Sequence, residues 1–151
     1  MLATLLKLQL LKGEPPQEQV YLLRMCAEGS LVGGMSVALG VRPDELFGYL
    51  AALVGGVVRR LKVLDVRDEP SPQMVMSYGP QETPVTWHVP NVRALVDHVN
   101  RLGAESAVAV LGEWEDALQL WCLPRSALRA LLQEPGFRPE NLAELEPLAT
   151  S

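Results

Sequence analysis

Residues 28–60 read EGSLVGGMSVALGVRPDELFGYLAALVGGVVRR, and this stretch decides the expected fold of the first half of the chain. The short apolar run over 33–39 predicts a short helix that ends at Gly40. Pro43, with two acidic residues after it, suits the start of a second helix. The apolar face of that second helix consists of Leu46, Leu50 and Leu53.

The segments on either side complete a compact pattern. An amphipathic helix is expected before the stretch, whereas Leu2–Leu11 fits a helix and a strand equally well. After Gly55-Gly56, where glycine disfavours a helix interior, two apolar runs flank a proline-containing segment and predict two strands joined by a turn. The expected elements are a helix over 17–28, strands over 57–67 and 73–78, and a turn over 68–72.

The second half predicts a β-α-β-β-α-α order. Val85, Trp87 and Val89 alternate with polar residues, as in a half-buried strand, and Asn91 is a typical N-cap for the helix that follows. The expected elements are strands over 83–89, 106–111 and 117–123, a hairpin around 112–116, and helices over 92–102, 126–133 and 139–146.

The chain is therefore expected to be α+β. Residues 1–79 predict a three-helix module closed by a β-hairpin. Residues 80–151 predict a small antiparallel sheet with two or three helices that serves interaction or dimerisation. A chain of 151 residues accommodates either one compact domain or two small ones.

The stretch from 28 to 60 resembles the winged helix-turn-helix family. In that family a short helix ends in Leu-Gly-Val and a branched apolar residue follows the glycine by six positions, which is the spacing of Gly40 and Leu46. Gly56-Val57-Val58-Arg59-Arg60 is similar to the family's step into the wing. The resemblance covers roughly residues 17–79 and implies a wing built from the strands near 61–67 and 73–78.

The basic residues of this half are the candidates for contact with DNA phosphates. A DNA-reading helix offers basic or polar side chains to the major groove, but residues 43–58 contain no Lys or Arg. The cations lie before the helix and along the expected wing: Arg42, Arg59, Arg60, Lys62 and Arg67. About four or five phosphate contacts would give a strongly salt-dependent, mostly non-specific affinity. The same side chains also suit a solvated strand edge.

Charge and apolar content narrow the classes of function. The net charge is −5; residues 1–70 carry eight basic and eight acidic side chains, whereas residues 71–151 carry five and ten. Any contact with nucleic acid therefore belongs to the first half. The chain is 48% apolar, which excludes a disordered protein. Its longest uncharged apolar run, 46–58, is shorter than the roughly 20 residues that cross a bilayer, so no membrane partner is expected.

Contact with a protein is favoured over contact with DNA. The apolar run over 46–58, with Phe47 and Tyr49 beside its core stripe, suits a protein partner or a second copy. In the second half, Trp114 stands among three carboxylates at the expected hairpin end, where an exposed tryptophan would anchor a basic partner. The other arrangement, which is the commoner one for a large aromatic residue, is that Trp114 packs back onto the sheet beside Trp121 and the three carboxylates are solvated. The sequence therefore predicts a non-enzymatic binding or regulatory protein with Phe47, Tyr49 and Trp114 at its interface.

A small cytoplasmic enzyme or ligand-binding protein is the alternative, with a site near His88, Asp97 and His98. The adjacent Asp97 and His98 point about 100° apart on a helix. Cys26 and Cys122 are too scattered from the histidines for a zinc pattern, and no glycine-rich phosphate motif occurs. No catalytic residue, metal or cofactor is therefore expected. The low cysteine content and the absence of a signal-peptide pattern predict a reducing cytoplasm.

Overall fold

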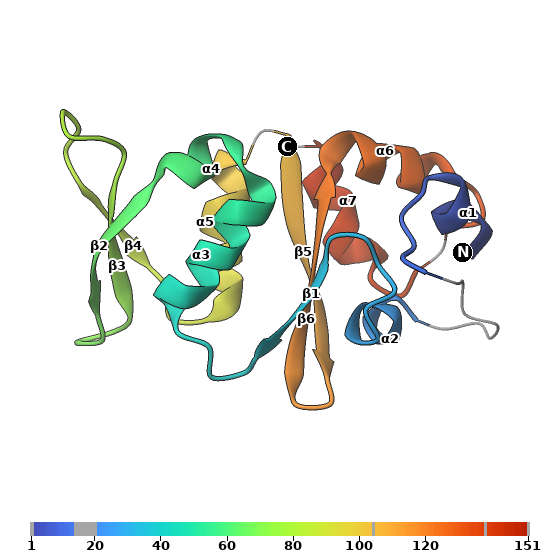
Figure 1. Ribbon diagram of the computed structural model, residues 1–151, viewed down its shortest axis with the longest axis horizontal. Helices are drawn as coiled ribbons and strands as arrows, with labels where there is room; N and C mark the ends of the chain where they lie inside the picture. Colours follow the sequence, from blue (N-terminus) through green and yellow to red (C-terminus); the bar gives the residue numbers. More distant parts are fainter. Residues whose placement is uncertain (1, 14–20, 104, 138, 151) are drawn as a thin grey trace. The chain divides into compact units, whose positions relative to one another are not determined.

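The computed structural model describes residues 2–13, 21–103, 105–137 and 139–150, and it confirms the α+β class. The chain divides into two compact units (Figure 1). Unit 1 comprises Met1–Leu39 and Glu105–Ser151, and unit 2 comprises Gly40–Ala104. Unit 2 is thus inserted in the sequence of unit 1. The expected boundary near Gly79 falls inside unit 2, between two strands that pair with each other.

Unit 1 is built on a three-stranded antiparallel sheet in the order β1-β6-β5. The β5–β6 hairpin is confirmed, and it is longer than expected because its strands continue to a two-residue turn. Both turn residues, Glu115 and Asp116, have positive φ angles of 49° and 63°, as the tightest hairpin turns require. The elements of unit 1 are α1 (Leu2–Lys7), α2 (Leu22–Ala27), β1 (Gly34–Ala38), β5 (Ser106–Trp114), β6 (Ala117–Pro124), α6 (Arg125–Gln133) and α7 (Leu142–Thr150).

Strand β1 corrects the helix expected over 33–39. Gly33 has φ +82°, and a Cβ at this position would overlap the carbonyl oxygen of Cys122. The Gly33 carbonyl accepts a hydrogen bond from the Cys122 amide at 2.9 Å, so the chain enters the sheet beside β6. From there Gly34 pairs with Trp121 and Ala38 with Ala117. Pairing with a distant strand overrides the local helix preference, because a short run has little helical stability of its own.

The elements behind the winged-helix resemblance are divided between the units. The helix expected over 17–28 is observed as α2 in unit 1, and residues 14–20 lie outside the described part of the chain. The helix expected from Pro43 and the two wing strands are present in unit 2. The resemblance itself stays a prediction.

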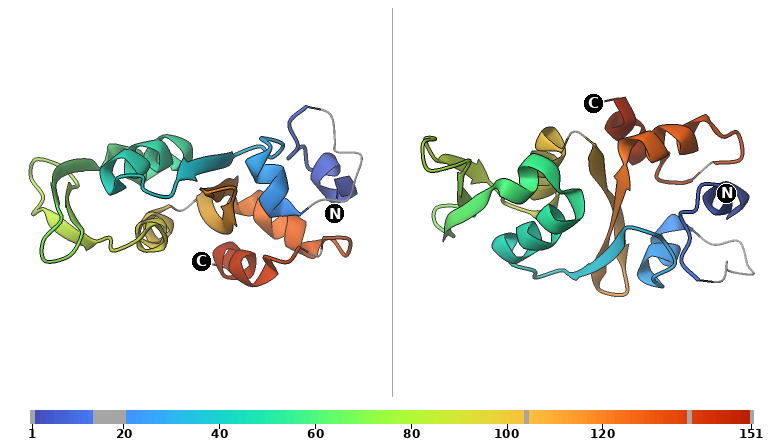
Figure 2. Two further views of the ribbon diagram at one scale, coloured as in Figure 1. Left: turned by 90° about the horizontal axis from the view of Figure 1, so that it is seen from below. Right: turned by 45° about the horizontal axis from the view of Figure 1, so that its top comes forward.

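The core of unit 1 lies between one face of its sheet and the helices. Trp121 is fully buried there, and its indole Nε1 donates a hydrogen bond to the Val32 carbonyl at 2.9 Å. In Figure 2 the α6 and α7 ribbons lie against each other. The core side chains are Leu5, Leu10, Leu22, Met25, Cys26, Leu31, Ala109, Leu111, Trp121, Leu123, Leu128, Leu131, Phe137, Leu145 and Ala149.

Two arginines of α6 hold the end of α7. The buried Arg125 guanidinium donates to the Leu148 carbonyl, and Arg129 Nη1 donates to the Ala149 carbonyl at 3.3 Å. Burial and then the nearby charge of Arg129 lower the pKa of Arg125. Cations are favourable at a helix C-terminus, where carbonyls lack partners within the helix. The last helix, α7, begins at Leu142, later than expected, and runs beyond the end of the expected range 139–146. The two arginines bind carbonyls in this added C-terminal part.

Both cysteines are free, and Cys26 belongs to the core of unit 1. Its Sγ donates to the Leu120 carbonyl at 3.3 Å. Burial raises the pKa of Cys26, and hydrogen bonds to the backbone at Met35 and Leu120 offset only part of this effect. Burial also raises the pKa of Cys122, to about 11. Both thiols are therefore protonated at neutral pH.

We expect Cys26 to react slowly with a thiol reagent such as DTNB in the folded Cys122→Ser variant. Thiolate is the reacting form, so a raised pKa and burial both lower the rate, by about tenfold or more relative to the urea-unfolded chain at pH 8. Because the folded pKa is raised, the contribution of this thiol to stability is present below its ordinary pKa. That contribution is lost as the pH rises above about 9. Equal rates for the folded and unfolded chains would contradict the burial of Cys26.

Unit 2 is a second three-stranded antiparallel sheet, in the order β2-β3-β4, with helices on one face. Met74, Met76 and Trp87 are buried on that face, while alternate residues of the same strands are more exposed, as in a sheet with one solvated side. Strand β2 is an edge strand with a bulge at Leu64. The elements of unit 2 are α3 (Pro43–Val54), α4 (Gly56–Arg60), β2 (Lys62–Arg67), β3 (Gln73–Ser77), β4 (Val85–His88) and α5 (Val92–Leu102).

The helix signals of unit 2 are largely confirmed. Pro43 begins α3 with two acidic residues in its first turn, and Asn91 Oδ1 accepts from the Ala94 amide at 2.9 Å as the N-cap of α5. The strand expected from residue 57 is wrong in its first part, because residues 56–60 form the short helix α4. Gly55 and Gly56 have φ angles of +69° and +57°, so they end α3 and restart the helix in a new direction.

Candidate protein-binding surface on helices α3 and α4

The five cations predicted to contact phosphate all lie in unit 2, but two of them are neutralised by neighbours. Arg42 pairs with Asp44 at 3.3 Å, and Arg67 pairs with Asp65 at 2.9 Å, both at exposed positions. The pairs form between residues two apart in sequence. Their carboxylates compete with any phosphate for these two guanidinium groups.

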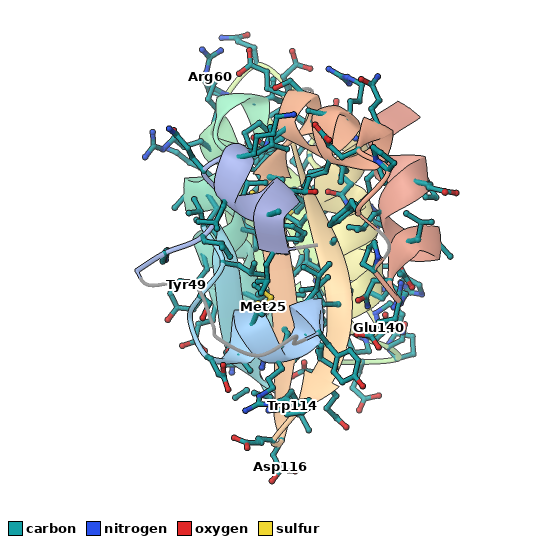
Figure 3. The ribbon with its side chains drawn as sticks, turned by 90° about the vertical axis from the view of Figure 1, so that its right-hand side faces the viewer. Met25, Tyr49, Arg60, Trp114, Asp116 and Glu140 are labelled. Atoms are coloured by element: carbon teal, nitrogen blue, oxygen red, sulfur yellow. The ribbon has the colours of Figure 1, made fainter. Side chains whose placement is uncertain are left out.

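The other three cations gather within four residues. Arg59 and Arg60 end α4, and Lys62 begins β2; all three are exposed. Among the described residues, no carboxylate lies within ion-pairing distance of them. Figure 3 shows the Arg60 side chain projecting away from the ribbon. These three side chains concentrate positive charge at the end of α4 and the start of β2.

Phe47 does not belong to an interface, which corrects the expectation for this residue. It is only 3% exposed, and its ring meets Trp87 edge-on with centroids 5.8 Å apart and an interplanar angle of 80°. The buried face of α3 includes Phe47 and Ala51 beside Leu46 and Leu50, whereas Leu53 of the expected core stripe is exposed. The core face is thus rotated toward Phe47.

Tyr49 is confirmed as exposed, and two other apolar residues that follow it in sequence are exposed as well. Tyr49 is 52% exposed, Leu53 is 44% exposed one helical turn later, and Val57 of α4 is 52% exposed. Residues four apart share one helix face, so Tyr49 and Leu53 are neighbours. A group of exposed apolar side chains such as Tyr49 and Leu53 marks a contact site more often than an isolated one does, and Val57 adds an exposed apolar residue at the start of α4.

These apolar residues and the three available cations follow each other along α3, α4 and the start of β2. We call this set the α3–α4 surface: Tyr49, Leu53, Val57, Arg59, Arg60 and Lys62. Val57 and Arg60 are three residues apart on α4 and therefore share a face of that helix. The surface combines apolar area with uncompensated positive charge. Tyrosine and arginine are among the residue types enriched at protein interfaces.

An open depression of about 560 Å³ lies elsewhere on unit 2, between the start of α3 and the edge strand β2. Its lining includes the Arg42–Asp44 pair and residues 63–66 of β2, around the bulge at Leu64. The charges in it are already paired, and Asp65 is engaged by Arg67. It therefore offers less net charge to a ligand than the α3–α4 surface does.

His88 and His98 are in contact, but the contact is a structural hydrogen bond between the His98 ring and the His88 backbone carbonyl. The His98 ring stacks on Trp87 at 4.8 Å, with Nε2 3.0 Å from the His88 carbonyl and Nδ1 2.9 Å from Arg101 Nη2. Because a guanidinium only donates, Nδ1 accepts and Nε2–H donates. The Nε2–H group thus links α5 to β4, and Nδ1 binds Arg101 within α5.

The rest of the alternative site does not converge. His88 Nε2 lies 3.2 Å from Ser71 Oγ, and both residues are solvent-accessible. Asp97 is exposed, and its side chain makes no hydrogen bond or ion pair with any described residue. Within the described chain no three His, Cys, Asp or Glu side chains form a group suited to a metal ion. Nor is any helix in those parts of the chain long and apolar enough to cross a membrane.

Trp114 lies at the end of the β5–β6 hairpin, where it pairs with Ala117 next to the turn. It is half-buried and lies on the same face of the sheet as Trp121, and its role as an interface anchor stays a prediction. Figure 3 shows Trp114 near the hairpin end and Asp116 at its tip. Glu113, Glu115 and Asp116 are exposed and form no ion pair with a described residue.

The two units differ in charge. Unit 2 carries seven basic and seven acidic residues and has no net charge. Unit 1 carries six basic and eleven acidic residues, which accounts for the entire net charge of −5.

A scan against protein-family models and searches of curated proteins and of solved structures find no match for this chain.

Proposed function

We propose that this protein is a non-enzymatic protein-binding module, and that its α3–α4 surface binds an acidic segment that also carries apolar side chains. One observation carries the proposal: Tyr49, Leu53 and Val57 are exposed directly before three cations that no described carboxylate neutralises. A partner that covers the apolar residues brings its own charge close to the cations. Carboxylates are favoured there, because opposite charges steer association and like charges oppose it.

Contact with DNA is the second candidate, and the same three cations favour it. They supply only about three phosphate contacts, which corresponds to a salt slope near −3 on a double-logarithmic plot and to weak binding at physiological salt. The apolar residues of the α3–α4 surface have no counterpart on a phosphate backbone. Duplex DNA therefore serves as a competitor in the test below.

The free thiols at Cys26 and Cys122 support a reducing compartment, because secreted proteins tend to oxidise their cysteines. We therefore propose a cytoplasmic location and a regulatory or adaptor role there.

The test is a titration by fluorescence anisotropy with a labelled synthetic helical peptide that has Leu and Phe on one face and Glu on the other. We expect the wild-type protein to bind it. Arg59→Glu/Arg60→Glu/Lys62→Glu and Leu53→Asp should each weaken binding by about tenfold or more, which is about 1.4 kcal/mol. A peptide with Lys in place of Glu should not bind.

The matched control is Arg42→Gln/Arg67→Gln, which removes cations that are already paired. It should change the affinity by less than about twofold, since exposed ion pairs contribute little. Thermal unfolding curves check that every variant is folded. Equal binding by wild type and the triple variant would contradict the proposal, as would displacement of the peptide by DNA at much lower concentration than by unlabelled peptide.

A further inference from the structure

The β5–β6 hairpin presents an acidic, aromatic end in unit 1. Glu113, Glu115 and Asp116 are exposed around the half-buried Trp114, and no described cation pairs with them. The two-residue turn leaves little freedom at this end, because the strands pair up to Trp114 and Ala117. A short, well-ordered segment loses little conformational entropy when it binds.

The hairpin end and the α3–α4 surface are complementary in charge and in apolar content. Among the described residues, the hairpin end carries three unpaired carboxylates and a tryptophan, and the α3–α4 surface carries three unpaired cations and the apolar residues Tyr49, Leu53 and Val57. Unit 1 has a net negative charge and unit 2 has none. Over longer distances this difference also favours the approach of unit 1 of one copy to the cations of another copy.

We propose that the acidic segment bound by the α3–α4 surface is the β5–β6 hairpin end of a second copy of this chain. This inference rests on the proposed function of that surface and names its partner. The two contact surfaces are different, so the contact is heterologous. It produces a closed assembly or an open chain of copies according to the rotation that it imposes.

The experiment uses full-length protein in sedimentation equilibrium over a range of protein and salt concentrations. Wild type should associate reversibly as its concentration rises, and high salt should weaken the association by about tenfold or more, because the surface charges are screened. The surface variant is Arg59→Glu/Arg60→Glu/Lys62→Glu. The hairpin variant is Glu113→Lys/Glu115→Lys/Asp116→Asn, where Asn is chosen because it tolerates the left-handed conformation of the turn.

Each variant alone should stay monomeric, because its two contact surfaces then have the same sign of charge. A mixture of the two variants should associate, since the acidic surface of one fits the basic hairpin of the other. Combining both sets of substitutions in one chain should restore self-association. The control Glu140→Lys/Glu146→Lys makes a similar charge change at exposed positions of unit 1 that are not part of the hairpin end, and it should associate like wild type.

Monomeric wild type at all concentrations, or failure of the mixed variants to associate, would overturn the inference. If the acidic peptide still binds the α3–α4 surface in that case, the proposed function stands and only the identity of the partner is wrong. If the peptide also fails to bind, both fail. Unfolding curves for each variant separate loss of association from loss of fold.

Discussion

Replacing Trp121 with alanine is expected to lower the free energy of unfolding of unit 1 by about 3–5 kcal/mol. Trp121 is 0% exposed and lies on the central strand β6, where it pairs with Ala109 on one side and Gly34 on the other. The substitution removes a large buried surface and leaves a cavity, and deletions of buried aromatic side chains cost this much. It also leaves the Val32 carbonyl without the indole donor.

The measurement is urea unfolding followed by circular dichroism, with hydrogen exchange to separate the two units, because a chain with two units need not unfold in a single step. Trp114→Ala is the control, since the same side chain is removed from a half-buried position near the hairpin turn. The control should cost clearly less. A change of less than about 1 kcal/mol for Trp121→Ala would mean that this tryptophan is not the centre of the core.

The second large effect is expected at Phe47. Phe47→Ala should destabilise unit 2 by about 3–5 kcal/mol, because it removes a buried ring and its edge-on contact with Trp87. Tyr49→Ala, two positions along the same helix, should stay within about 0.5 kcal/mol of wild type, as is usual for exposed positions. Hydrogen exchange of α3, β4 and α5 reports the change.

Binding of the acidic peptide should show the reverse order for these two residues. Tyr49→Ala should weaken binding without changing stability, whereas Phe47→Ala should affect binding only through loss of fold. If Tyr49→Ala destabilised unit 2 as much as Phe47→Ala, the assignment of one residue to the core and the other to the surface would be wrong.

Much of the local structure was predictable because its signals lie within a few residues. The Pro43 start of α3, the Asn91 cap of α5 and the two hairpins follow from capping and turn chemistry. Strand β1 was not predictable in this way. Its partner is β6, some 80 residues away in sequence, and nothing in residues 34–38 indicates which strand they pair with. The insertion of unit 2 within unit 1 follows from this same distant pairing.

The candidate site was predictable in its cations and only partly in its apolar residues. Asp44 and Asp65 stand two residues from Arg42 and Arg67, so the signal for neutralised cations was present in the sequence. The sequence pattern places Phe47 and Leu53 on the wrong sides of α3, because an apolar stripe at positions 46, 50 and 53 and one rotated toward 47 and 51 both have helical spacing. Only packing against Trp87 distinguishes them.

Binding of an acidic segment by the α3–α4 surface is tested most directly by chemical-shift mapping of the acidic amphipathic peptide on ¹⁵N-labelled protein. The largest shift changes should fall within residues 49–62, on α3, α4 and the start of β2, and they should vanish in the Arg59→Glu/Arg60→Glu/Lys62→Glu variant. Shift changes centred on the depression beside Arg42 and Leu64, or spread over the sheet of unit 1, would contradict it.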